Sequence, residues 1–316
     1  MYANPGTPLP RRELLRAAAL AAAALALRVP VAACSPGNDA PAARRSGDPD
    51  RERLVRWTES IRAEGLVSPD AAPGRAAARV GVLAGGTPYE AQTPEAYLRA
   101  GGDPAAVEPL ALSLTRFDCV TLVEACLAVA RVAAGRVGAS WNAFGRQVER
   151  MRYRGGERRG YASRLHYFSE WIADGEKRGL VRDLGQELGG TEDRRPLRFM
   201  TSHRRSYPAL ADDGVFGEIG DIERGLDDHA RYVVATRRIP AVAEGIETGD
   251  VLAFATAIPG LDVTHAAFAY RDQSSVLRVL HAPLSGGVVE VTRATLPEYV
   301  AAIRRATGIL VARPLR

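Results

Sequence analysis

The feature that most constrains this fold is a cysteine placed between a polar segment and a long apolar run. Cys119 ends the segment Thr-Arg-Phe-Asp-Cys, and residues 120–132 after it are largely apolar. This run has too few turn-forming residues for a loop and is too long for a strand, so it predicts a buried helix. Asp118 is a favourable N-cap residue, which places Cys119 in the first turn of that helix.

The position of Cys119 at a helix start gives it a candidate chemical role. Unpaired N–H groups and the positive end of the helix dipole favour a thiolate, which is the better nucleophile. The negative charge of Asp118 acts in the opposite direction. Because free cysteines are more often buried and inert, this stretch alone leaves two interpretations open, a nucleophile or a core residue.

Composition separates the chain from nucleic-acid-binding proteins. The sequence is 46% hydrophobic and 25% charged, as in globular proteins. Its net charge is +5, but Lys177 is the only lysine, so abundant arginine beside abundant alanine indicates codon bias. No Lys/Arg-rich run with interleaved aromatic residues occurs. We therefore expect no nucleic-acid partner.

Residues 1–34 predict an export signal of the twin-arginine type. Arg11 and Arg12 precede an apolar run over residues 17–27, which is about half the length that a bilayer span requires. Val-Ala-Ala-Cys at residues 31–34 resembles a lipobox, in which Cys34 would carry a lipid anchor. Simple cleavage after Ala33 is the alternative. We expect location in the periplasm or cell envelope, with a membrane contacted only through that anchor.

The rest of the chain predicts one α+β domain over residues 51–316, after a flexible linker at residues 35–50. We expect an insertion at about residues 180–245, made of loops, short strands and one helix near residues 222–226. Other helices are expected over residues 51–65, 70–83, 93–100, 141–153 and 296–304. Strands are expected over residues 251–256, 263–270, 276–282 and 288–292, with one more at the C-terminus.

The two cysteines of this domain are not expected to form a disulfide. Cys119 and Cys126 are seven residues apart, or about 10.5 Å along a helix, whereas a disulfide tolerates about 7 Å between Cα atoms. Free thiols are uncommon in exported proteins, which is easier to understand if one of them does chemistry. Metal-binding spacings such as Cys-x-x-Cys and His-Glu-x-x-His are absent from the sequence, so neither a metal nor a cofactor is expected.

Two histidines fall on consecutive predicted strands. A three-residue loop over residues 272–274 would place His265 directly opposite His281 on one face of the sheet. A two- or four-residue loop would instead place His281 opposite Ala266, on the other face. Adjacent histidines allow one imidazole to orient the other as a base. Two core histidines with satisfied hydrogen bonds are the alternative.

The segment over residues 164–172 combines charged and aromatic side chains. It is either half of a packed amphipathic helix or one wall of a substrate cleft that includes Arg164 and His166. These two interpretations are equally supported by the residues themselves.

Taken together, these segments resemble the NlpC-type papain-like cysteine hydrolases of bacterial cell walls. The shared order is Gly-Thr-Pro-Tyr, Asp-Cys at a helix start, Gly-Asp opening a strand, and histidine on the next strand. The longer strings at residues 117–124, 164–172 and 261–265 are similar to one branch, the N-acetylmuramoyl-L-alanine amidase-like family. This family was long filed as a domain of unknown function, and the resemblance covers about residues 51–314.

The resemblance implies a papain-like α+β fold. A helical lobe would carry the cysteine at a helix N-terminus and pack on a small antiparallel sheet that carries the histidines. Cys119 would be the nucleophile, His265 the base and His281 the residue that orients the base. Substrate-binding roles are implied for Tyr89, Asp118, Arg164, His166 and Tyr167. Thirty residues separate Tyr89 from Cys119, more than in the compact members of the superfamily.

The implied reaction is hydrolysis of the amide bond between N-acetylmuramic acid and L-alanine, and the implied partners are peptidoglycan fragments (muropeptides). A stem-peptide endopeptidase that cuts after D-glutamate is one alternative, and an acyltransferase that uses the same triad is another. A wall-binding module without activity is disfavoured, because all three triad residue types are present. The oligomeric state is left open by the sequence.

Overall fold

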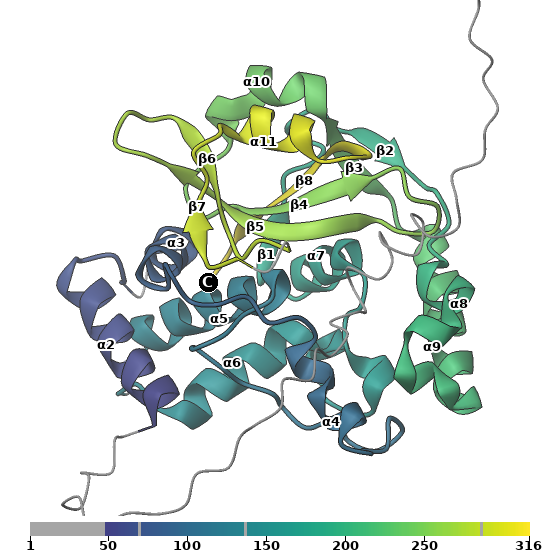
Figure 1. Ribbon diagram of the computed structural model, residues 1–316. Helices are drawn as coiled ribbons and strands as arrows, with labels where there is room; N and C mark the ends of the chain where they lie inside the picture. The colour runs from purple at the N-terminus through teal and green to yellow at the C-terminus, as the bar shows by residue number, and fades with distance from the viewer. Residues whose placement is uncertain (1–47, 69–70, 136–137, 285–286) are drawn as a thin grey trace, which may run out of the picture.

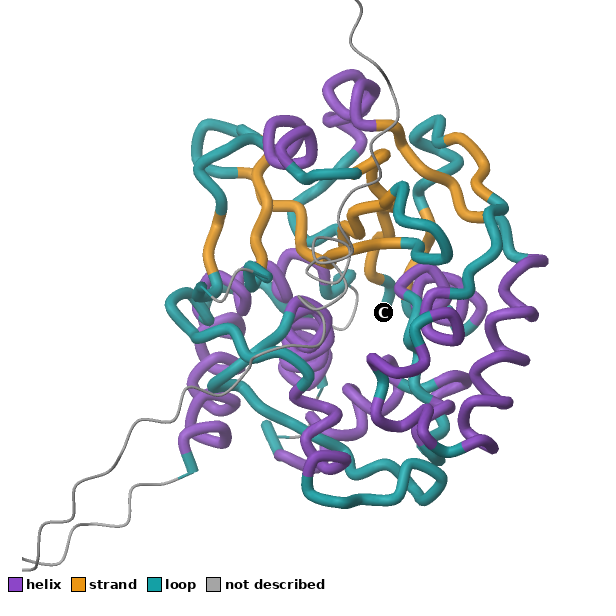
Figure 2. Tube along the Cα trace, turned by 45° about the vertical axis from the view of Figure 1, so that its right-hand side comes forward, coloured by secondary structure: helices purple, strands orange, loops and turns teal. Residues whose placement is uncertain are grey.

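The structure is a computed structural model that describes residues 48–68, 71–135, 138–284 and 287–316. The predicted export signal, including Arg11, Arg12 and Cys34, and nearly all of the predicted linker lie outside the described residues. A group of helices lies on one side of an antiparallel sheet, and the helices at residues 239–242 and 296–302 lie on the other side (Figure 1). Figure 2 shows the same layers from a second direction. The predicted α+β class is therefore confirmed.

The longer helices are α2 (Pro49–Ala63), α3 (Gly74–Leu83), α5 (Cys119–Ala134), α6 (Trp141–Arg152), α7 (Phe168–Lys177), α9 (Asp213–Gly225) and α11 (Leu296–Ala302). The short ones are α4 (Ala96–Arg99), α8 (Phe199–Ser202) and α10 (Ile239–Val242). Within the described residues, no helix is long and apolar enough to cross a membrane.

The strands are β1 (Val181–Asp183), β2 (Thr191–Asp193), β3 (Arg231–Ala235), β4 (Val251–Thr256), β5 (Val263–Arg271), β6 (Leu277–His281), β7 (Glu290–Val291) and β8 (Ala306–Pro314). Their order across the sheet is β2-β3-β8-β4-β5-β6-β7, and β1 also pairs with β8. All of these pairings are antiparallel. The C-terminal strand β8 therefore lies inside the sheet.

The segment predicted as an insertion contributes directly to this sheet. Strands β1 and β3 both pair with β8, and β2 extends the sheet beyond β3. The helix predicted near residues 222–226 is longer and begins at Asp213. It starts there because the Asp212 side chain accepts a hydrogen bond from the Val215 N–H. Val215, Ile219 and Glu223 then give α9 a buried face with helical spacing.

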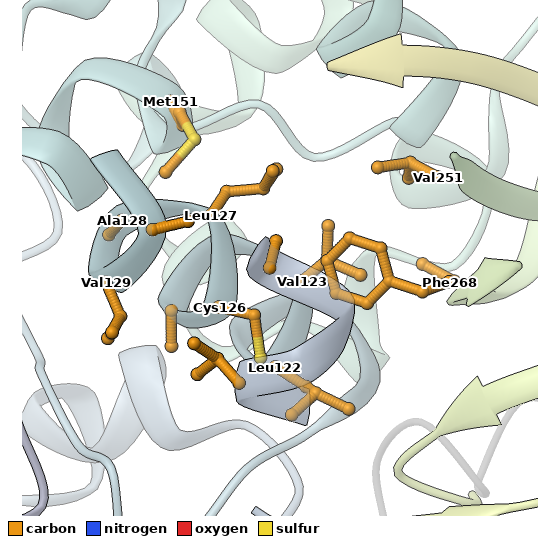
Figure 3. Close-up of a cluster of buried hydrophobic side chains, with 14 of the residues drawn as sticks. Leu122, Val123, Cys126, Leu127, Ala128, Val129, Met151, Val251 and Phe268 are labelled. Carbon is orange, nitrogen blue, oxygen red and sulfur yellow. The ribbon is translucent and has the colours of Figure 1, made fainter. Parts of the chain in front are cut away.

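Helix α5 runs through the centre of the helical lobe, as the apolar run predicts. Its contacts with α2, α3, α6 and β5 explain why its sequence is apolar on nearly all sides. Figure 3 shows this core, in which residues of α5 lie near Met151 of α6, Val251 of β4 and Phe268 of β5. The labelled residues of α5 are Leu122, Val123, Cys126, Leu127, Ala128 and Val129. The position of Cys119 is thus fixed by one of the most buried helices of the protein.

Strand β4 is covered on both faces. Val251, Ala253 and Ala255 belong to the core shared with α5. Leu252 and Phe254 belong to a second core on the opposite face of the sheet, beneath α10 and α11. All six residues of β4 are buried, which is why its sequence reads as a continuous apolar run rather than an alternating one.

Candidate active site

Cys119 is the first residue of α5, and Asp118 caps the helix as the sequence predicts. One carboxylate oxygen of Asp118 accepts hydrogen bonds from the Thr121 N–H at 2.8 Å and the Thr121 hydroxyl at 2.9 Å. The Asp118 N–H donates in return to the Thr121 hydroxyl oxygen at 2.9 Å, which completes a capping box. This carboxylate therefore holds the helix start, and its implied role in substrate binding stays a prediction.

The environment of Cys119 favours a thiol over a thiolate. The residue is half-buried, and burial together with the charge of Asp118 raises the pKa of its thiol to about 12. Backbone N–H groups of Ala266, Val120 and Cys119 itself oppose this shift but do not overcome it. The helix N-terminus alone thus does not produce the nucleophile expected from the sequence. A nucleophilic role for Cys119 would therefore require a base that takes its proton.

A histidine that could act as this base lies next to the thiol. Ala266, whose N–H interacts with the Cys119 sulfur, directly follows His265 on β5. The Nε2 atom of His265 is 2.9 Å from Nδ1 of His281 on β6, and the two rings are 5.1 Å apart at 79°. Within the described part of the chain, Nδ1 of His265 is buried without a hydrogen-bond partner. In the tautomer with hydrogen on Nε2, this nitrogen can accept a proton.

The prediction that the two histidines share one face of the sheet is confirmed, but their predicted register is wrong. Arg271 pairs with Leu277 and Phe268 with Leu280 in the β5–β6 ladder. Counting one residue further places His281 opposite Ala267. His265 is its diagonal neighbour, which is still within reach of an aromatic ring. The register is shifted by two residues, so each side chain stays on its predicted face.

The side chain of Asp272 explains the shift. Its Oδ1 accepts hydrogen bonds from the N–H groups of Ser274 and Val276, and its own N–H donates to the Val276 carbonyl. The three-residue loop therefore begins at Gln273, one residue later than predicted, and Ser275 adopts a left-handed conformation with φ of 63°. Starting the loop one residue later moves every cross-strand pair by two.

Both histidines are neutral at neutral pH. Burial, with a smaller contribution from His281, lowers the pKa of His265 to about 3. Burial also lowers the pKa of His281 to about 4. A neutral imidazole has one protonated and one unprotonated ring nitrogen, so His265 can accept a proton only at the nitrogen without hydrogen.

Three further side chains surround the histidine pair, and the sequence did not predict a role for them. The ring of Phe254 stacks on His265 at 5.6 Å between centroids. The hydroxyl of Tyr299, on α11, lies 3.3 Å from Nδ1 of His281. A carboxylate oxygen of Glu290 lies 3.8 Å from Nε2 of His281. Of these three residues, only Glu290 could have been connected with the histidines from the sequence, because it lies on the predicted strand at residues 288–292 that follows the strand of His281.

Tyr89 lies beside the start of the cysteine helix despite its distance in sequence. It pairs with Phe117 in an isolated parallel bridge, and the Glu90 N–H donates to the Phe117 carbonyl at 2.9 Å. Burial raises the pKa of the Tyr89 hydroxyl, and the nearby Cys119 adds to that shift. Tyr89 therefore lies near Cys119, and its implied contact with substrate stays a prediction.

Arg164 is engaged inside the protein. Its guanidinium lies 3.1 Å from a carboxylate oxygen of Glu95 and 3.3 Å from one of Glu108. The same group lies over the ring of Tyr161, at 4.9 Å from its centroid. Arg164 is buried, so these contacts favour a structural role, and its implied contact with substrate stays a prediction.

His166 and Tyr167 also have partners within the fold. Nε2 of His166 lies 3.0 Å from the Tyr161 carbonyl oxygen, and burial holds its pKa well below the usual range. The buried Tyr167 hydroxyl donates to Glu223 and accepts from the Met200 N–H. Of the two interpretations of residues 164–172, these contacts favour the packed one.

The described residues hold no group of three or more His, Cys, Asp or Glu side chains that could bind a metal ion. Cys119 and Cys126 are both free thiols, as their spacing predicts. Cys126 is completely buried in the α5 core. Of these two thiols, Cys119 is the less buried.

This arrangement defines a class of protein in which a helix-terminal cysteine lies against an antiparallel sheet that carries a histidine pair. The sequence profile of one family, described as N-acetylmuramoyl-L-alanine amidase-like, matches residues 79–309. This match spans well over half of the chain, and the chain belongs to that family. The resemblance found in the sequence is thereby confirmed.

Several solved structures are similar to this one. One structure of an N-acetylmuramoyl-L-alanine amidase from Bacteroides uniformis shares 26% identity with a TM-score of 0.67, covering 85% of this chain and 100% of that chain. Another shares 28% identity with a TM-score of 0.67, covering 75% and 97%. A protein from Bacteroides fragilis, provisionally named a xylanase, shares 30% identity with a TM-score of 0.66, covering 74% and 98%. None of the curated proteins compared with the chain matches it.

Proposed function

We propose that this protein is a cell-wall cysteine amidase that hydrolyses the amide bond between N-acetylmuramic acid and L-alanine in peptidoglycan fragments. Membership of the amidase-like family supports the reaction class. The observation that carries the proposal is the hydrogen bond between His265 and His281. Nδ1 of His265 has no hydrogen-bond partner among the described residues, and the next residue, Ala266, contacts the Cys119 sulfur through its N–H. This is the base and orienting half of a catalytic triad, next to a thiol that needs a base.

In the proposed reaction, Nδ1 of His265 takes the thiol proton while the Cys119 sulfur attacks the carbonyl carbon of the muramic acid lactyl group. The backbone N–H of Cys119 stabilises the oxyanion of the tetrahedral intermediate. His265 then gives its proton to the L-alanine nitrogen, and the peptide leaves as an amine. Water, deprotonated by His265, attacks the resulting thioester. The sugar acid is released, and the proton returns to the sulfur.

Catalytic hydrogen bonds are often long in proteins without substrate. The lack of a direct bond between the Cys119 sulfur and His265 within the described residues is therefore compatible with this mechanism. Tyr89, whose hydroxyl lies near Cys119, contacts the substrate there in this proposal.

The test is a digest of a defined disaccharide–peptide, read by mass spectrometry. An amidase releases the intact stem peptide with a free L-alanine amine, and the sugar gains a free carboxylate. Cleavage after D-glutamate would instead identify an endopeptidase, and products that carry an added amine would identify an acyltransferase. Release of sugars from xylan, with the muropeptide left intact, would reject an amide hydrolase altogether.

Action on this substrate requires export, which we propose on the basis of residues 1–34. Replacement of both Arg11 and Arg12 by lysine should hold the protein in the cytoplasm, and unchanged export would reject the twin-arginine route. Cys34→Ser should release a lipid-anchored protein from membranes. If the wild-type protein is already free of membranes after export, the lipid anchor is rejected.

A further inference from the structure

The histidine pair has two arrangements of its protons, and only one of them suits catalysis. If His265 carries its hydrogen on Nε2, this N–H donates to Nδ1 of His281, and Nδ1 of His265 is left unprotonated. If instead His281 carries its hydrogen on Nδ1, this N–H donates to Nε2 of His265, and the hydrogen of His265 is on Nδ1. The 2.9 Å distance between Nε2 of His265 and Nδ1 of His281 fits both arrangements. In the second arrangement Nδ1 of His265 already carries a hydrogen, so it cannot accept a proton from Cys119.

Glu290 favours the first arrangement. It is the cross-strand partner of His281 in the β6–β7 ladder, and one of its oxygens lies 3.8 Å from Nε2 of His281. An ionised carboxylate is an acceptor only. At 3.8 Å the contact is electrostatic rather than a hydrogen bond, and the negative charge favours hydrogen on Nε2 of His281, which leaves Nδ1 of that ring as an acceptor.

Tyr299 acts on the other nitrogen of the same ring. Its hydroxyl lies 3.3 Å from Nδ1 of His281, and its ring meets His281 edge-on at 5.1 Å and 74°. Once Nδ1 is unprotonated, its single lone pair accepts mainly from the N–H of His265 at 2.9 Å, and the Tyr299 hydroxyl can share it as a second, weaker donor. Helix α11, which carries Tyr299, is held by a capping box between Thr295 and Glu298.

We propose that Glu290 and Tyr299 are positioning residues that fix the tautomers of both histidines, so that His265 presents an unprotonated Nδ1 to Cys119. Both residues act through His281 and neither touches the reacting atoms. The tautomer assignment stands on the geometry of the four side chains alone, whereas its effect on catalysis rests on the proposed amidase function.

The test measures the histidine tautomers directly in the full protein by ¹⁵N NMR, with ring signals assigned from single histidine substitutions. In the wild-type protein we expect His265 as the Nε2–H tautomer and His281 also as the Nε2–H tautomer. The double variant Tyr299→Phe/Glu290→Ala should shift His265 toward the Nδ1–H form. The matched control Tyr270→Phe/Glu192→Ala removes a hydroxyl from β5 and an exposed carboxylate from β2, and should leave both tautomers unchanged.

Activity provides a second readout on the muropeptide. The double variant should lose at least about tenfold in kcat with little change in KM, because a catalytic histidine held in the wrong tautomer can lose up to about 10⁴-fold. Tyr299→Phe/Glu290→Asp, which keeps a carboxylate, should recover part of this loss. A wild-type His265 with hydrogen on Nδ1, or a double variant with unchanged tautomers, would overturn the inference. Correct tautomers in a wild-type protein that cleaves no muropeptide would reject the proposed function instead.

Discussion

Arg152 on α6 and Glu124 on α5 form an ion pair inside the helical lobe, with Nε of Arg152 only 2.7 Å from a carboxylate oxygen of Glu124. Both side chains are almost completely buried. A second nitrogen of Arg152 donates to the Ala111 carbonyl at 2.7 Å. The pair thus joins α5 to α6, and it also joins both helices to the segment before α5 that contains Ala111.

Removing one member of this pair should destabilise the protein strongly. Arg152→Met leaves the Glu124 carboxylate buried without its counter-charge, which typically costs about 3–5 kcal/mol. The double variant Arg152→Met/Glu124→Leu should recover much of that loss, because it removes both charges together. Urea unfolding measures each free energy. A single variant as stable as the wild-type protein would show that the pair is not needed to hold α6 on α5.

The turn that opens β4 should accept only glycine. Gly249 has a φ of +94°, and a Cβ at this position would lie 2.1 Å from the backbone of Gly74 at the start of α3. Gly249→Ala should therefore lower the free energy of unfolding by more than about 3 kcal/mol or prevent folding. The alanine would have a strained φ, and the backbone at Gly74 or at residue 249 would also have to move.

Gly65 provides a matched control for this substitution. Its φ is +66°, and nothing lies within 4 Å of a Cβ built there. Gly65→Ala should cost only about 1 kcal/mol, the usual cost of a left-handed conformation. Equal melting temperatures for the two variants would contradict the close contact between β4 and α3.

The histidine pair should make stability depend on pH. Burial lowers the pKa of His265 to about 3 and that of His281 to about 4, from 6.5. As the pH falls below 6.5, the unfolded chain binds protons that the folded protein does not, so stability is lost toward acid. Buried carboxylates with a raised pKa, such as those of Asp118 and Glu124, act in the opposite direction.

A comparison with His265→Gln/His281→Gln isolates the effect of the two histidines. Between pH 7 and pH 5 the wild-type protein should lose on the order of 1–2 kcal/mol per histidine more than this variant loses. Urea unfolding at both pH values gives the difference. Parallel pH profiles for the two proteins would mean that the histidines are not held neutral by the fold.

Elements with strong local signals were predicted well from the sequence. The apolar run after Asp118 predicted the start of α5 correctly, because the capping residue and the buried residues of this helix are close together in the sequence. The strand predicted over residues 251–256 matches β4 for the same reason. The role of β1 and β3 could not be foreseen, because these short strands are defined by pairing with the distant C-terminal strand β8.

The sequence singled out Cys119, His265 and His281, which the structure places close together, but it did not predict their contacts in detail. The register of the histidines depends on hydrogen bonds of one side chain, Asp272, which pattern alone does not reveal. Tyr299 comes from a helix that packs over the sheet, so no local spacing connects it with His281. The raised pKa of Cys119 results from burial, which depends on the whole fold rather than on the helix that carries the thiol.

The central claim is that Cys119 is the nucleophile. Cys119→Ala should fold normally, because a half-buried residue at a helix start fills little of the core. Cys126→Ala is the matched control, since it removes the other free thiol of the same helix. Its loss from the core should cost roughly 1 kcal/mol of stability and leave most of the activity.

The most direct measurement is the rate at which each variant releases intact stem peptide from a defined muropeptide, with the fold of each checked by circular dichroism. Cys119→Ala should lose on the order of 10⁴-fold or more in kcat, as other enzymes do when their nucleophile is removed, while Cys126→Ala stays within a few-fold of the wild-type rate. A folded Cys119→Ala protein that cleaves the muropeptide at a near wild-type rate would contradict the cysteine amidase account.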